Sequence, residues 1–278
     1  MIRIISGNPG AGKTLLAMHF MSIDTSINGY DNYLKSCNQI KTFNDCGYAF
    51  DYPKQKHVTY FNGQARISVM GKPVKNPYSF NPWKMALPTR ENDVHLFFPC
   101  SKIYIDEAQR FYNSRLFQKF PTAVSRFFEL HRQWDLDITL IAQRAGLIDL
   151  NIRELAEELI YVEDLNTEVD TLGNLIKATW VVRKFTNNAD LEHYLDGHKE
   201  LGQEEIIESF ENLFKFYDTK FFKFLFLNQR RSQKFLQEYL RPFKYSPELV
   251  DALSEVYSFE APPGYYENDK KKKCVGGK

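Results

Sequence analysis

A glycine-rich stretch that ends in Gly12-Lys13-Thr14 matches, from Gly7 onward, the spacing G-x-x-x-x-G-K-[ST]. The glycines let the backbone curl so that successive N–H groups point toward one centre, where they bind phosphate oxygens. A lysine at this position reaches the β- and γ-phosphates of a nucleoside triphosphate, and the Thr14 hydroxyl ligates Mg²⁺. The residues predicted to line the site are Gly7, Asn8, Pro9, Gly10, Ala11, Gly12, Lys13, Thr14 and Leu15. The pattern predicts binding of ATP with Mg²⁺, and an accidental match in a glycine-rich turn is the alternative.

Two adjacent acids, Asp106 and Glu107, follow a mostly apolar run at residues 100–105 that is typical of a buried strand. A carboxylate at the end of such a strand can hold the Mg²⁺ shell, usually through water, and we assign that role to Asp106. Glu107 would then face the γ-phosphate and polarise the attacking water as a general base, which favours hydrolysis. A strand that ends in a solvated acidic turn is the alternative.

Gln143 ends a second apolar, β-branched run, at residues 137–142. In a parallel sheet, ligands gather beyond the carboxyl ends of the strands. Gln143 is therefore predicted to stand beside Glu107 and to sense the γ-phosphate or position water. A surface amide that caps a strand is the alternative.

Alternating strand and helix patterns position these side chains. The predicted strands lie at residues 2–5, 100–105, 137–143, 158–162 and 178–185, and the predicted helices at residues 13–22, 121–134 and 149–157. Such alternation predicts an α/β fold of the P-loop NTPase type, with a mostly parallel sheet flanked by helices.

Residues 31–95 are predicted to form an insertion that contains a β-hairpin, because Asn62-Gly63 separates strand-like runs at residues 58–61 and 65–69. Its mixture of basic and aromatic residues suits nucleic-acid contact and equally suits a solvated loop. We predict an ATPase domain at residues 1–185 that includes this insertion. Residues 186–278 are predicted to form a helical extension with helices near 204–216 and 221–240 and a disordered basic tail. The basic, aromatic second helix either packs on the domain or lies on a membrane surface.

Composition and charge limit the partners and the cellular compartment that we expect for the protein. The 278 residues carry a formal net charge of +1, so no global field attracts nucleic acid, and 43% hydrophobic residues support a sizeable core. The four cysteines lack C-x-x-C spacing, which predicts a reduced, cytoplasmic protein without a zinc site. The first predicted strand leaves no room for a signal peptide, and no apolar run reaches the length of a membrane span. Contact with a membrane would therefore be peripheral.

The chain resembles the zonula occludens toxin-like (Zot) ATPases, the inner-membrane assembly motors of filamentous phages, within the FtsK/HerA group of P-loop ATPases. The resemblance covers roughly residues 1–185. It is carried by the glycine-rich loop, by residues 103–109 (IYIDEAQ), by the segment from His131-Arg132 to Gln143, and by residues 148–153. Asp135 and Gln133 depart from the family pattern, and many members have a transmembrane helix that this chain lacks.

The resemblance implies an ATP-hydrolysing motor for phage morphogenesis that drives virion assembly and extrusion or DNA translocation. It implies a homo-oligomer, a hexameric ring, in which an arginine of one subunit reaches the γ-phosphate held by the next. The candidate arginines are Arg126, Arg132 and Arg144. Expected partners are single-stranded DNA or virion proteins, in the host cytoplasm at or near the inner membrane. The alternatives are a cytosolic genome-packaging ATPase, a nucleotide-dependent switch with little turnover, and a small-molecule kinase.

Overall fold

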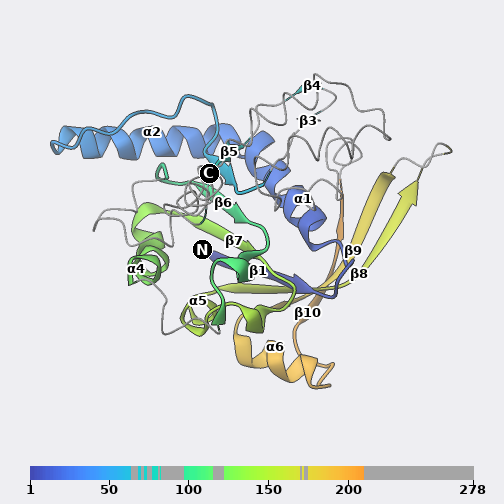
Figure 1. The fold of residues 1–278 in the computed structure, drawn as a ribbon. Coiled ribbons are helices and arrows are strands. Elements are labelled where there is room, and N and C mark those ends of the chain that lie inside the picture. Colours follow the sequence, from blue (N-terminus) through green and yellow to red (C-terminus); the bar gives the residue numbers. More distant parts are fainter. Residues whose placement is uncertain are drawn as a thin grey trace, which may run out of the picture. The chain divides into compact units, whose positions relative to one another are not determined.

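An eight-stranded mixed sheet organises the protein, and its strand order is β10-β9-β8-β1-β7-β6-β2-β5 (Figure 1). The computed structural model describes residues 1–63, 68–69, 72–73, 77–80, 82, 97–114, 122–169, 171 and 175–209. The chain divides into two compact units, Met1–Tyr217 and Asp218–Lys278, and all described residues belong to the first.

Six neighbouring strands of this sheet run parallel. They are β8 (Glu158–Val169), β1 (Ile2–Gly7), β7 (Asp137–Ile141), β6 (Lys102–Ile105), β2 (Thr59–Phe61) and β5 (Tyr78–Ser79). Two antiparallel strands, β9 (Leu175–Phe185) and β10 (Gln203–Glu208), complete one side. The mostly parallel α/β sheet predicted from the sequence is confirmed. The order places β7 between β1 and β6, so the end of β7 lies between the glycine-rich loop and the acidic pair.

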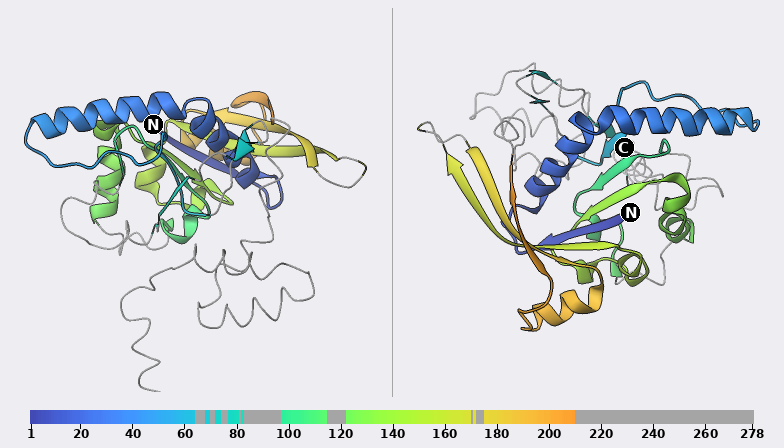
Figure 2. Two further views of the ribbon diagram at one scale, coloured as in Figure 1. Left: turned by 90° about the horizontal axis from the view of Figure 1, so that it is seen from above. Right: turned by 180° about the vertical axis from the view of Figure 1, so that it is seen from behind.

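The helices cover both faces of the parallel strands. They are α1 (Lys13–Ser26), α2 (Gly29–Asp45), α4 (Thr122–Leu130), α5 (Leu150–Glu154) and α6 (Asn188–Leu195), and short 3₁₀ turns occur at η2 (Ala108–Arg110), η4 (His131–Trp134) and η5 (Ala145–Leu147). The view from above in Figure 2 shows α1 and α2 along the same side of the sheet. On the other face, Ile2 and Ile4 join one buried cluster with Phe127 and Phe128 of α4. Burial on both faces explains why β1 reads as a continuous apolar run.

The segment predicted to be a hairpin-containing insertion is built differently. Strand β2 has β5 and β6 as its parallel neighbours, so both of its edges are occupied and the hairpin with residues 65–69 is wrong. Strand β3 (Ser68–Val69) pairs instead antiparallel with the next strand, β4 (Lys72–Pro73), in a separate two-stranded sheet, so the segment does contain a hairpin, but at other residues than predicted. Helix α2 was not predicted. The segment therefore extends the main sheet and adds a 17-residue helix.

The predicted helix at residues 204–216 is also wrong where the structure describes it. Residues 203–208 form β10, which pairs antiparallel with β9 and sets Ile207 opposite Trp180. Edge pairing against a long strand outweighs the weak helical spacing of the apolar residues in this segment. Residues 210–278, with the predicted helix at 221–240 and the basic tail, lie outside the described residues. Among the helices that the structure describes, none combines the length and apolar composition that a membrane span requires.

Candidate nucleotide-binding site

The glycine-rich loop connects β1, which ends at Gly7, to α1, which begins at Lys13. Gly12 caps α1 in a left-handed conformation, with φ 78°, that L side chains rarely adopt. Gly7 is equally restricted, because a Cβ there would lie 2.5 Å from the Val162 carbonyl oxygen of the neighbouring strand β8. Close approach and positive φ therefore require glycine at both ends of the loop. The following helix presents its N-terminal N–H groups at the same place, as an anion site requires.

Lys13 curls back over this loop. Its Nζ donates to the carbonyl oxygens of Gly7, at 3.0 Å, and Asn8, at 2.8 Å. Partial burial lowers the pKa of Lys13, and the carboxylates of Glu107 and Asp106 act in the opposite direction. The ammonium group is thus held above the loop and faces the two acids, where it can exchange backbone carbonyls for phosphate oxygens.

Thr14 and Asp106 meet although they are 92 residues apart in the chain. The Thr14 hydroxyl donates to the Asp106 carboxylate, with its Oγ1 3.2 Å from Oδ2 and 3.3 Å from Oδ1. Asp106 is only 7% exposed, and this burial raises its pKa to about 6. The Glu107 N–H donates to Oδ1 at 2.9 Å, and this hydrogen bond acts to lower the pKa. A hydroxyl and a carboxylate side by side are hard oxygen donors, and this set fits Mg²⁺.

Asn62 fixes the backbone at Asp106 from the neighbouring strand. Its Oδ1 accepts from the Asp106 N–H at 2.8 Å, and its Nδ2 donates to the Asp106 carbonyl at 3.0 Å. Asn62 follows the end of β2, which lies parallel to β6. The sequence patterns do not identify Asn62 as a site residue, because an Asn-Gly pair between two strand-like runs predicts a hairpin turn.

Glu107 adopts a left-handed backbone conformation, with φ 52° and ψ 40°, directly after Asp106. Its side chain is half-buried and accepts a hydrogen bond from Gln109 Nε2 at 2.5 Å, with Arg110 Nε 3.9 Å away. Non-glycine residues in this conformation concentrate at functional sites. From this turn, the Glu107 carboxylate lies close enough to Lys13 to act on its pKa.

Gln143 lies where the strand order requires, beyond the end of β7. Its carbonyl oxygen accepts from the Gly7 N–H at 3.4 Å, which joins it to the start of the loop, and its side chain is exposed. The structure therefore brings Gln143 together with the loop, Thr14 and the acidic pair at one edge of the sheet.

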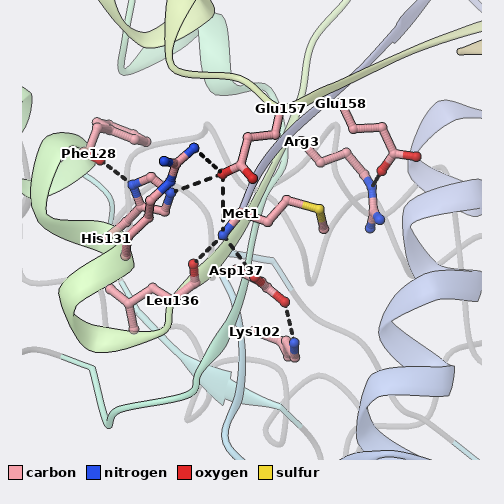
Figure 3. A network of polar contacts seen from close by, with 10 residues as sticks. Met1, Arg3, Lys102, Phe128, His131, Leu136, Asp137, Glu157 and Glu158 are labelled. Atoms are coloured by element: carbon pink, nitrogen blue, oxygen red, sulfur yellow. Dashed lines mark hydrogen bonds and ion pairs between the residues drawn. The ribbon is translucent and has the colours of Figure 1, made fainter. Parts of the chain in front are cut away.

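The three candidate arginines lie in different places. Arg126 is exposed on α4, and Arg144 is exposed immediately after Gln143. Arg132 lies on η4 near the opposite edge of the sheet, where its guanidinium is 3.3 Å from the Glu157 carboxylate. That edge carries a polar network around the Met1 amino group, which donates to Asp137 and to the Leu136 carbonyl (Figure 3).

A parallel sheet with a glycine-rich loop between β1 and α1, facing a strand-end carboxylate across one intervening strand, defines a P-loop NTPase fold. The family model of the zonular occludens toxin (Zot) matches residues 1–169. The chain belongs to the Zot family.

The solved structures that match the chain share little sequence with it. The N-terminal domain of zonular occludens toxin from Neisseria meningitidis is 18% identical over 78% of this chain and 98% of its own, with a TM-score of 0.45. The genome packaging NTPase B204 from Sulfolobus turreted icosahedral virus 2, in complex with ATPγS, is 10% identical over 74% of this chain and 95% of its own, with a TM-score of 0.36. Its AMPPCP complex is 11% identical over 67% and 97%, with a TM-score of 0.35. No curated protein matches the chain.

Proposed function

We propose that the protein binds Mg²⁺·ATP at the loop and hydrolyses it. The observation that carries this proposal is the contact between the Thr14 hydroxyl and the Asp106 carboxylate, 3.2 Å apart, beside the Lys13 ammonium. Thr14 and Asp106 would hold Mg²⁺, which supplies charge neutralisation for the phosphates. Lys13 and the loop N–H groups bind and orient the β- and γ-phosphates.

Glu107 is the residue we assign to water activation. Its carboxylate is half-buried next to Lys13, and its anchored side chain points from a strained turn. It takes the proton of the attacking water as the water oxygen bonds to the γ-phosphorus and the bond from that phosphorus to the β,γ-bridging oxygen breaks, with ADP as the leaving group. Gln143 orients that water from the end of β7. A carboxylate and an amide around a water suit hydrolysis better than transfer to a metabolite, which argues against a kinase.

We further propose that turnover drives phage morphogenesis, either virion assembly and extrusion or DNA translocation, in a homo-oligomeric ring. Membership of the Zot family supports this role, and a genome-packaging ATPase is the second candidate. Arg132 is already paired with Glu157. The arginine that reaches a neighbouring subunit's nucleotide is therefore proposed to be the exposed Arg126 or Arg144.

The test compares Lys13→Ala and Glu107→Gln with Glu154→Gln, which removes an exposed charge on α5 and serves as the matched control. Nucleotide affinity and steady-state ATP turnover are measured, with and without single-stranded DNA. Lys13→Ala is expected to abolish tight binding. Glu107→Gln is expected to keep the parent affinity and to lose about 10²- to 10⁴-fold in kcat, the usual contribution of a general base.

Two outcomes separate the candidate functions, and two more test the residue assignments. Turnover that rises with single-stranded DNA supports a motor that acts on DNA. Tight binding with turnover near zero in the parent protein indicates a switch. Parent-level turnover by Glu107→Gln removes Glu107 from the role of base, and unchanged affinity of Lys13→Ala rejects the loop as the nucleotide site.

A further inference from the structure

Trp180 lies directly behind the phosphate-binding loop. It is a fully buried residue of β9, the strand that runs beside the start of α1 in Figure 1. Its indole Nε1 donates to the Gly12 carbonyl oxygen at 3.3 Å. The ring is enclosed on its other sides by His19 of α1, with ring centroids 5.8 Å apart, and by its cross-strand partners Leu165 and Ile207. A ring held from these directions is a fixed donor.

The Gly12 carbonyl is the acceptor of two hydrogen bonds. The first comes from the Leu16 N–H at 2.8 Å and opens helix α1, and the second comes from Trp180. In a trans peptide the C=O and the following N–H point in opposite directions. Because the Gly12 carbonyl is held toward α1 and Trp180, the Lys13 N–H of the same peptide points away from them, to the side where the phosphates bind.

Trp180 and its cross-strand partner Leu165 also restrict which residue fits at position 12. A Cβ on Gly12 would lie 2.6 Å from Leu165 Cδ2 and 2.9 Å from Trp180 Nε1. Leu165 and Trp180 face each other across the β8–β9 ladder. The side chains of both residues therefore lie against the loop at Gly12.

We propose that Trp180 is a positioning residue for the nucleotide. By holding the Gly12–Lys13 peptide, its indole N–H preorganises an amide that binds phosphate, and it ties the loop to the antiparallel β8–β9 ribbon. This role rests on the proposed nucleotide-binding function, and it adds a contribution that the loop pattern itself does not contain. Preorganised donors lower the entropy cost of binding, so the effect appears as affinity.

The test is Trp180→Phe, which keeps an aromatic ring and removes the N–H donor. Trp134→Phe, which lies in η4 near the opposite edge of the sheet, is the matched control. The affinity for Mg²⁺·ADP is measured by calorimetry, and KM and kcat for ATP are measured by steady-state turnover. Loss of one hydrogen bond that orients the loop is expected to weaken affinity and raise KM by about 3- to 10-fold. The kcat at saturation is expected to stay within about twofold of the parent value, because the lost interaction acts on substrate and transition state alike.

The unfolding midpoint of the ligand-free protein separates positioning from packing. Binding of Mg²⁺·ADP is also expected to change the tryptophan emission of the parent protein and of Trp134→Phe, because Trp180 donates to the loop. A packing role alone would make Trp180→Phe lower the unfolding midpoint and leave the affinity for Mg²⁺·ADP as in the parent, and that result would overturn the proposal. If the parent protein itself fails to bind Mg²⁺·ADP, the proposed function falls and this inference falls with it. If the parent binds and Trp180→Phe binds equally well, only the positioning role is rejected.

Discussion

Replacement of Asp106 by asparagine is expected to stabilise the ligand-free protein while it abolishes the metal site. Burial raises the pKa of Asp106 from its ordinary 3.8 to about 6. A difference of about two pKa units means that the ionised carboxylate destabilises the folded state by about 3 kcal/mol at neutral pH. Asparagine is neutral and nearly the same size. Its Oδ1 can accept from the Glu107 N–H, and its Nδ2 can donate to Thr14, so no polar partner is lost.

The sign of the effect follows from the direction of the shift. Because the folded-state pKa of Asp106 is raised, the folded parent protein holds this proton more tightly than the unfolded chain does. Protonation of Asp106 therefore stabilises the parent below its ordinary pKa of 3.8, and that contribution is lost as the pH rises through about 6. Asp106→Asn should match the parent near pH 4 and exceed it by up to about 3 kcal/mol above about pH 7.

The assay is urea and thermal unfolding of parent and variant without Mg²⁺ or nucleotide, at several pH values between 4 and 8. A gain of about 3 kcal/mol raises the thermal midpoint by roughly 6–12 °C in a domain of this size. Glu154→Gln serves as the control for loss of an exposed acid. With Mg²⁺·ATP added, the order should reverse, because the parent, which keeps the metal site, gains more stability from the ligand than the variant does. A variant that is less stable than the parent by the same amount at every pH would refute the reasoning, since a packing defect and not desolvation would then dominate.

Two further substitutions test the geometry around the site. Gly12→Ala should cost more stability and more nucleotide affinity than Gly10→Ala, because a Cβ at Gly12 lies 2.6 Å from Leu165 Cδ2 while one at Gly10 meets nothing within 4 Å. Both positions have positive φ, so alanine pays the same cost in backbone strain at each. Equal losses of stability and affinity in the two variants would therefore contradict a steric role of Leu165 and Trp180 at Gly12. Asn62→Ala removes both hydrogen bonds to the Asp106 backbone and should destabilise the protein by about 1–3 kcal/mol. It should also raise the Mg²⁺ concentration needed for half-maximal turnover, and an unchanged Mg²⁺ requirement would show that Asn62 does not position Asp106.

The sheet and the grouping of the site residues were predictable because their signals are local. Buried parallel strands read as apolar runs, and the residue that follows each run lies at the carboxyl edge. This rule placed Asp106 and Gln143 correctly beside the loop. Applied to the strand that ends at Phe61, it would also have found Asn62. The Asn-Gly pair favours a hairpin turn and so predicts that β2 pairs with the segment that follows it. The strands that β2 actually pairs with, β5 and β6, lie further along the chain.

Helix α2 was missed because its inward stripe is largely polar. Its buried positions are Gly29, Asn32, Ser36 and Ile40, which follow helical spacing but show only one large apolar residue. A periodicity search detects hydrophobicity and not burial, so it passes over such a helix. The roles of Trp180 and Leu165 were equally hidden, because they depend on the pairing of β8 with β9 and on the approach of that ribbon to Gly12. Tertiary contacts of this kind leave no local pattern.

The strand order also determines which neighbouring elements must shift if the glycine-rich loop changes its conformation. At its start, the Gly7 N–H is joined to the Gln143 carbonyl at the end of β7, and at its end the Gly12 carbonyl is joined to Trp180 of β9. The loop is thus attached on one side to the strand that leads to Arg144 and on the other to the antiparallel ribbon. A displacement of the loop by nucleotide would have to break one of these contacts or carry its partner along. Because Trp180 is fully buried, the rearrangement of least cost is expected at the exposed residues that follow β7.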